Sequence, residues 1–252
     1  MSTTRTNHIA RLLALAGPMI LSTSVITLMQ LVDAMVLSRY SNHAVAAIGP
    51  AGMAVLLFQG FLFGITGYTG TFVAHAHGQA DHQRIMTSIW IGLQVSLAAG
   101  VIALLTAWPL ASLFLMSGHD VTVAQDERTY FLICMAGSLF PVLNAAWSGW
   151  LAGVGRPAVV TVITFLSFFA NAYLAWAMVL GHGGFTAMGI AGAAWSTVVA
   201  QALASVCYLV LFIKEGGLRS YAARCLDTAA LRHFLELSVP MGIRISGELF
   251  AW

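Results

Sequence analysis

Charged side chains are scarce in this sequence. Asp, Glu, Lys and Arg make up 8% of the 252 residues, whereas 59% belong to the hydrophobic set, and a soluble domain usually carries about 25% charged residues. Because so few charges cannot cover a soluble globule of this size, the apolar surface must face lipid. Lipid requires every backbone polar group to be paired within the protein, which leaves helices or a closed barrel. Long runs without alternation favour helices.

Several chemical signatures are also missing. Cys134, Cys207 and Cys225 are scattered without a CxxC spacing, so neither a disulfide framework nor a zinc site is indicated. The sequence contains no Walker A loop, which argues against ATP as an energy source, and no HExxH or GxSxG motif. We therefore expect a protein that is not an enzyme and holds no cofactor. A net charge of +2 gives no support for nucleic-acid binding.

Six apolar runs are each long enough to cross a bilayer, which takes about 20 residues. They cover residues 12–37, 45–74, 85–115, 130–152, 159–180 and 190–213. The third run is unusually long, and Pro109 is where we expect it to break. The predicted fold is therefore an all-α integral membrane protein, a six-helix transmembrane bundle.

The distribution of Lys and Arg predicts the orientation of these spans. Only Arg39 and Arg128 lie in the first, third and fifth connections. Eight basic residues lie in the N-terminal segment and the even-numbered connections: Arg5, Arg11, Arg84, Arg156, Lys214, Arg219, Arg224 and Arg232. The positive-inside rule then places the N-terminus in the cytoplasm. We expect a multi-pass protein of the bacterial inner membrane, with a short amphipathic helix in the basic loop after the sixth span.

A seventh apolar segment begins at Phe234, and the sequence ends within it. Residues 233–241 align with residues 11–19 at an offset of 222, with four identities in nine positions. The sequence thus predicts three parts: a six-helix lobe over residues 1–213, a cytoplasmic loop over 214–233, and over 234–252 a truncated seventh helix that starts a second lobe. The partner expected for this chain is the missing C-terminal lobe of the same protein.

Asp33 is the only acidic residue well inside the six predicted spans, and it lies on one helical face with Thr23, Thr27 and Gln30. An ionisable residue inside a membrane span is a candidate functional group. Such a stripe points to a bundle interior or a water-filled cavity. We weigh a cation or proton site against a carboxylate that reaches toward the lipid headgroups.

Two further spans carry polar stripes, namely Thr161, Thr164, Ser167 and Asn171 on the fifth, and Thr197, Gln201 and Ser205 on the sixth. Their amide and hydroxyl oxygens suit a weakly held monovalent cation or a protonated carboxyl. Interhelical hydrogen bonding explains them equally well.

Glu248 and a group of three histidines are the remaining candidate site residues. Glu248 lies near the middle of the seventh span, where a carboxylate without a partner would be costly, so we expect it to titrate or to bind a cation. His75, His77 and His82 fall in a polar loop, where solvated histidines are a better explanation than a metal site.

Several motifs resemble those of the MATE (multidrug and toxic compound extrusion) family, in its NorM-like branch. They include the Gly17-Pro18 pair followed by Leu31-Val32-Asp33, the run Ala46-Ala47-Ile48-Gly49, residues 78–81 and 151–156, Asn171 with residues 189–197, and Pro240-Met241-Gly242 leading to Glu248. The resemblance runs through the whole sequence.

The resemblance implies one lobe of a two-lobe exporter that moves amphipathic, often cationic compounds in exchange for Na⁺ or H⁺. Asp33, Asn171 and Thr197 would bind the cation or proton in the N-lobe and Glu248 would do so in the C-lobe. Gln30, Thr27 and Gln201 would line the substrate cavity. Ala175 stands one turn after Asn171 where some branches carry a second acid, and Ser38 and Ser41 replace usual glycines. A lipid-linked precursor flippase and a non-transporting membrane subunit remain alternatives.

Overall fold

A computed structural model of the chain describes residues 17, 20–21, 24–25, 27–116, 118–217 and 228–251. All regular elements in these ranges are helices. They are Thr27–Ser38, α2 (Asn42–Gly67), α3 (Thr69–Gly78), α4 (His82–Ser112), the 3₁₀ turn η1 (Leu113–Met116), α5 (Val121–Ala136), α6 (Leu139–Gly153), α7 (Pro157–Leu180), α8 (Ile190–Lys214) and α9 (Thr228–Phe250).

Apart from the fourth span, the helices agree with the predicted membrane spans, with small shifts at their ends. Within the described residues, four segments are long and apolar enough to cross a bilayer: Asn42–Gly78, His82–Met116, Pro157–Leu180 and Ile190–Lys214. A bent pair, α5 with α6, makes a fifth. The first predicted span is represented by Thr27–Ser38, and its earlier part falls mostly outside the described residues, Thr23 included.

The fourth span differs from its prediction. It starts at Val121 rather than at residue 130, and it breaks between Ala136 and Leu139 with a bend of 47°. The early start has a local cause, because the Asp120 carboxylate accepts hydrogen bonds from the hydroxyl and the backbone N–H of Thr122 and so caps α5. The same bonds lower the pKa of Asp120. Most of the stretch expected to be a loop is therefore helical.

Two other boundaries lie at different residues than expected. α4 continues through Pro109 to Ser112, although proline has no N–H to bond the carbonyl of Leu105. α9 begins at Thr228, so the predicted cytoplasmic loop over 214–233 overlaps its first turns, and residues 218–227 lie outside the described residues. Ala230 and Leu231, in the loop where a short amphipathic helix is expected, pack with Phe234 against Ile65 and Ile91.

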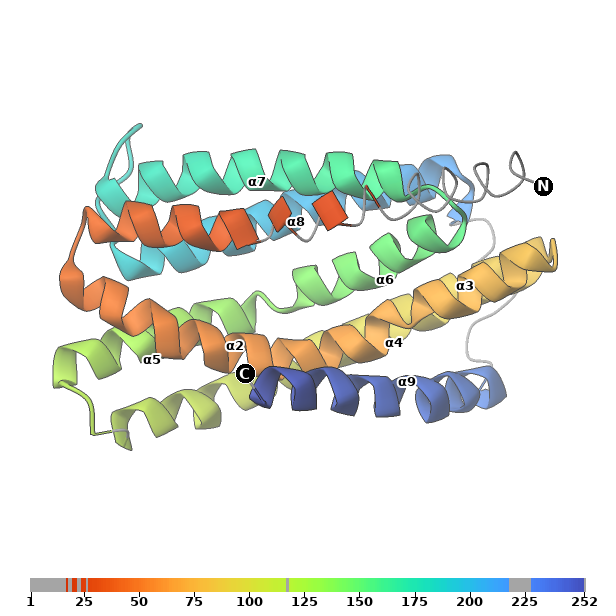
Figure 1. Cartoon of the computed structure of the whole chain (residues 1–252), viewed down its shortest axis with the longest axis horizontal. Coiled ribbons are helices and arrows are strands. Elements are labelled where there is room, and N and C mark those ends of the chain that lie inside the picture. The colour runs from red at the N-terminus through yellow and green to blue at the C-terminus, as the bar shows by residue number, and fades with distance from the viewer. Residues whose placement is uncertain are drawn as a thin grey trace, which may run out of the picture.

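The helices run nearly parallel to the long axis of the molecule (Figure 1). α7, α8 and the Thr27–Ser38 helix lie on one side, and α2, α3, α4 and α9 on the other. α5 and α6 run between the two groups, in contact with α2 and α4 on one side and with α8 on the other. The break in the fourth span therefore lies at the centre of the bundle.

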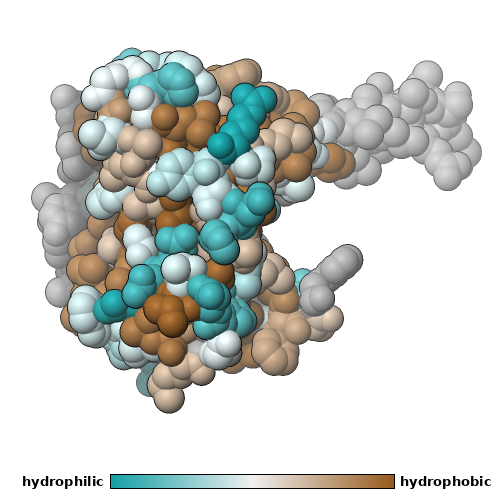
Figure 2. All heavy atoms as spheres, turned by 90° about the vertical axis from the view of Figure 1, so that its left-hand side faces the viewer, coloured by the Kyte–Doolittle hydropathy of each residue, from teal (hydrophilic) through white to brown (hydrophobic). Residues whose placement is uncertain are grey.

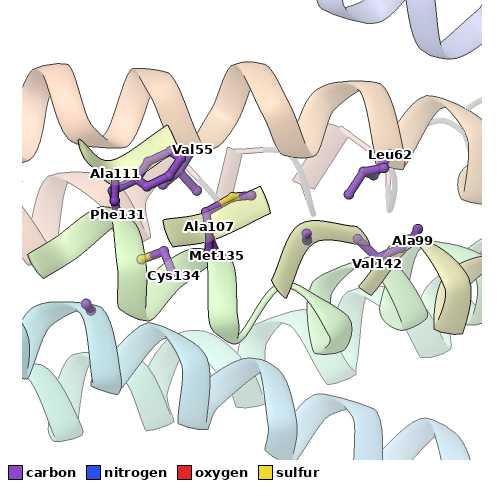
Figure 3. Packing of buried hydrophobic residues seen from close by; sticks show 11 residues of the cluster. Val55, Leu62, Ala99, Ala107, Ala111, Phe131, Cys134, Met135 and Val142 are labelled. Atoms are coloured by element: carbon purple, nitrogen blue, oxygen red, sulfur yellow. The ribbon is translucent and has the colours of Figure 1, made fainter. Parts of the chain in front are cut away.

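The core on the α2 side is built from small and medium side chains that let the helices approach closely. Figure 3 shows Val55 of α2 beside Ala111 of α4 and Phe131 of α5, and Leu62 of α2 farther along the helix, on the side of Ala99 and Val142. In contrast, large apolar side chains point outward: Leu105, Val162 and Phe169 are 71%, 67% and 64% exposed. Soluble proteins rarely expose so many large apolar side chains, whereas a protein surrounded by lipid does. On the end of the bundle that Figure 2 faces, hydrophilic residues lie among hydrophobic ones.

Candidate functional site: a cavity beside Asp33

A cavity of about 820 Å³ lies between the two groups of helices. Its lining comes from the Thr27–Ser38 helix, α2, α5, α6, α7 and α8, and most of that lining is apolar. Asp33 is the one Asp, Glu, Lys or Arg among the described residues that line it. A large, mainly apolar cavity with few polar groups is the usual form of a small-molecule site.

Contacts at one end of the bundle hold the Asp33 helix against α8. Leu37, one turn after Asp33, is fully buried with Ala44, Val179 and Ala193. Tyr40 then packs directly on Gly189, which precedes α8 and has a φ of +55°. A Cβ at Gly189 would lie 2.4 Å from the Tyr40 ring, so only glycine allows this approach. The packing brings Asp33 beside the second turn of α8.

α7 and α8 form a hairpin that is tight at its closed end. Gly181, in the left-handed conformation with a φ of +77°, ends α7, and Gly192 of α8 lies against the backbone of Met178 and Val179. Because the two backbones are in contact there, polar side chains farther along the hairpin meet directly. Asn171 Nδ2 lies 3.3 Å from Thr197 Oγ1 and 3.5 Å from Ser196 Oγ.

Asp33, Asn171 and Thr197 thus come together from three helices, of which the Asp33 helix is far in sequence from the α7–α8 hairpin. Thr197 Oγ1 lies 3.4 Å from Asp33 Oδ2 and 3.1 Å from the carbonyl oxygen of Ala193. The single threonine hydrogen can be donated to only one of these oxygens at a time. When it is donated to Ala193, the Thr197 oxygen faces Asp33 as an acceptor, an arrangement that favours a proton on Asp33 or a cation between the two.

Two oxygens in this cluster have no hydrogen-bond partner among the described residues. They are Asp33 Oδ1 and Asn171 Oδ1, and both are buried. Asp33 is 5% exposed and Asn171 is fully buried. Buried polar atoms nearly always have a hydrogen-bond partner. Two buried oxygens without one, next to a cavity, therefore suit a proton, a water or a cation that takes oxygen ligands. Ala175, also fully buried, supplies no second carboxylate.

A second polar group on the cavity wall was missed by the sequence reasoning. Asn144 of α6 donates from Nδ2 to Gln201 Oε1 at 2.8 Å, and its Oδ1 accepts from Ser205 Oγ at 2.7 Å. Gln59 of α2 donates to Ser138 Oγ at 2.8 Å, at the break between α5 and α6. Asn144 and Gln59 line the cavity. The criterion that selects Asn171, an amide inside an apolar span, selects both of them as well.

We expect Asn144→Ala to destabilise the protein. The change removes three hydrogen bonds, two from Asn144 Nδ2 to the side chain and backbone oxygens of Gln201 and one from Ser205 Oγ to Asn144 Oδ1, and it leaves Gln201 Oε1 without this donor in a part-buried position, at a cost of about 1–3 kcal/mol. The midpoint of unfolding in a titration with sodium dodecyl sulfate would report the loss. Ser148→Ala is the matched control on the same helix face, because the Ser148 hydroxyl bonds only the Ala145 carbonyl of its own helix. An equal loss in both variants would contradict the expectation.

The other predicted site residues are placed differently. Gln30 and Gln201 line the cavity, whereas Thr27 is exposed and is not among the lining residues. Glu248 lies on α9, away from the cavity lining. Arg244, one turn earlier, places its Nε 2.9 Å from Glu248 Oε1, while the expectation that Glu248 titrates or binds a cation stays a prediction.

His75 and His77 are exposed at the end of α3, where His75 contacts Gln79 at 3.0 Å. Within the described ranges, no group of three or more His, Cys, Asp or Glu residues is arranged to hold a metal ion.

Comparison with known proteins places this arrangement in a family. The model of the MatE family matches residues 18–177. A probable multidrug resistance protein NorM of Agrobacterium fabrum is 26% identical over 228 residues, which cover 86% of this chain and 48% of that protein. The protein of the same name from Pseudomonas putida is 28% identical over 247 residues, covering 94% and 52%. The chain spans about half the length of the curated relatives it matches.

Solved structures show the same fold. An outward-facing multidrug resistance MATE family transporter of the MOP superfamily superposes with a TM-score of 0.84 at 22% identity, covering 93% of this chain and 52% of that one. The inward-facing conformation of such a transporter gives 0.78 at 22% identity, covering 92% and 55%. With the family model matched over more than half of its residues, this multi-pass membrane protein belongs to the MatE family.

Proposed function

We propose that this chain is the first lobe of a secondary active exporter that moves amphipathic, often cationic compounds across the membrane in exchange for Na⁺ or H⁺. The observation that carries the proposal is the buried cluster of Asp33, Asn171 and Thr197 beside a mainly apolar cavity. The apolar lining suits a drug-like molecule, and Asp33 supplies the charge that a coupling ion needs. The NorM proteins with which the chain aligns are named as probable multidrug resistance proteins.

The coupling follows from one carboxylate serving two ligands. A proton or Na⁺ at Asp33 neutralises the cluster, whereas a cationic compound in the cavity is favoured when Asp33 is charged. Each ligand therefore stabilises a different state of the two-state equilibrium between outward-facing and inward-facing forms, as exchange requires. Neutral oxygens from Asn171 and Thr197 would complete the ion's shell. With Ala175 in place of a second acid, a single monovalent ion matches the charge of the site.

We further propose that the protein lies in a bacterial inner membrane with its N-terminus in the cytoplasm. The support is the eight-to-two distribution of Lys and Arg between the two sets of connections. The proposed function implies three partners: a drug-like small molecule, the lipid bilayer and a second lobe of the same protein.

The cavity argues against a flippase for lipid-linked precursors. Such lipids carry anionic phosphates, which proteins bind with Arg or Lys side chains. The described lining of the cavity contains neither Arg nor Lys. A cationic or neutral compound therefore fits better than an anionic lipid headgroup.

The proposal is tested by transport in liposomes that contain the complete gene product. Ethidium serves as the cationic probe, and Na⁺ and pH gradients are imposed one at a time without ATP. We expect ethidium to accumulate against its own gradient when at least one ion gradient is present, and the gradient that drives it identifies the coupling ion. Accumulation that needs ATP, or that persists after both gradients are collapsed, would contradict the proposal.

A further inference from the structure

α9 has two faces of opposite character. Phe234, Ser238 and Gly242 are buried against α2, α3 and α4. The other face carries four charged residues in two pairs, Arg232 with Glu236 and Arg244 with Glu248, and each pair joins residues one turn apart. These four charges are the reason why α9 is absent from the helices apolar enough to span a membrane.

The Arg244–Glu248 pair lies level with the middle of the candidate membrane span formed by α2 and α3. A Cβ on Gly64 of α2 would lie 2.5 Å from the Cα of Gly242, and Leu249 reaches Gly60 of α2. Ser246 Oγ lies 3.5 Å from the carbonyl oxygen of Leu57. Residues 57–64 are in the middle of the membrane span formed by α2 and α3, so Arg244 and Glu248, at the same level of α9, are as well.

Charges at this depth are costly unless they are paired. The Arg244 guanidinium lies 2.9 Å from the Glu248 carboxylate, and together the two side chains carry no net charge. Adding Na⁺ or a proton to Glu248 while Arg244 stays in place would leave an uncompensated positive charge. A cation can therefore bind Glu248 only by displacing a guanidinium that the helix itself holds one turn away.

We propose that Arg244 is a tethered cation that occupies Glu248, so that the coupling ion binds at Asp33 and not at Glu248. This inference rests on the proposed ion-coupled export, and it concerns which carboxylate takes part. Glu248 then stays ionised and paired through the cycle. Asp33, which has no Arg or Lys among its described contacts, is the group that gains and loses the ion.

The test uses dicyclohexylcarbodiimide, an apolar reagent that reacts with protonated carboxyl groups in apolar surroundings. The carboxyl oxygen adds to the central carbon of the reagent and its proton moves to a nitrogen, so no group leaves and the product keeps the full mass of the reagent. Mass spectrometry of peptides from the complete gene product, labelled in nanodiscs without Na⁺, locates the modified residue. The readout is therefore independent of transport.

We expect Glu248 to stay unlabelled in the native protein and to be labelled at least about tenfold faster in Arg244→Gln, because loss of the guanidinium makes protonation of Glu248 easier. Arg244→Lys keeps the charge and should keep the protection. Arg232→Gln is the matched control, since it breaks the same kind of pair on the same face, near the start of α9. It should leave Glu248 unlabelled.

Two results would overturn the proposal. One is labelling of Glu248 in the native protein at the rate seen in Arg244→Gln. The other is an Arg244→Gln protein in which Asp33 is labelled and Glu248 still is not. Failure of ion-driven ethidium transport would be a separate result, and it would count against the proposed function rather than against the pairing of Glu248 with Arg244.

Discussion

Replacing Asp33 by Asn is expected to abolish ion-driven export while leaving the protein folded. Asparagine has nearly the shape of aspartate and can still meet Thr197 and Asn171, so the cluster keeps its packing. It cannot gain or lose a proton, and it offers no negative charge to Na⁺. The ion then has no differential affinity for the two states, and an ion gradient cannot shift them.

The ethidium gradient sustained by the complete protein should therefore fall to that of liposomes without protein, because an ion with equal affinity for the two states drives no accumulation. The measurement is ethidium accumulation in liposomes under the driving ion gradient. Asp126→Asn is the matched control, because Asp126 is an aspartate on α5 that does not line the cavity. Undiminished transport by Asp33→Asn would remove Asp33 from the mechanism.

A second large effect is expected from Gly64→Ala. The added Cβ would lie 2.5 Å from the Cα of Gly242, 2.8 Å from its nitrogen and 2.9 Å from the carbonyl oxygen of Met241. All three are backbone atoms, so no side chain can turn away and α2 and α9 must separate. Overpacking of this kind costs about 1–3 kcal/mol. We expect the packing of α9 against α2 to be weakened.

The midpoint of unfolding in sodium dodecyl sulfate, measured on the purified protein, reports this cost. Gly52→Ala makes the same chemical change in the same helix, where nothing lies within 4 Å of the added carbon. That variant should be as stable as the native protein or slightly more so, since alanine favours a helix over glycine. A Gly64→Ala protein as stable as Gly52→Ala would show that α2 and α9 are not in contact at this point.

The membrane spans were largely predictable because hydropathy is a local sum along the chain. Residues 190–213 and 159–180 differ from α8 and α7 by no more than two residues at either end. The predictions failed where a single side-chain contact decided the outcome. The Asp120 cap starts α5 early, and the bend at Gly137 and Ser138 depends on how α5 and α6 pack between α2 and α8.

The candidate site was predictable only in part. Asp33, Asn171 and Thr197 could be selected from the sequence because polar groups are rare inside apolar spans, and helical spacing assigned each to a face of its own helix. Spacing within one helix says nothing about which faces of different helices meet. Thr27, on the same predicted stripe as Asp33, points away from the cavity, while Asn144 and Gln59 point into it.

Composition and periodicity alone therefore determined that this protein is a bundle of membrane helices with the carboxylate of Asp33 inside one of its predicted spans. The tertiary structure decided which partners that carboxylate has. The close passage of Tyr40 over Gly189 and of α7 over Gly192 brings Asp33, Asn171 and Thr197 together. The close passage of α2 over Gly242 turns Arg244 and Glu248 outward as a pair. Both outcomes depend on contacts between helices that are distant in sequence, and a local sequence pattern does not predict such contacts.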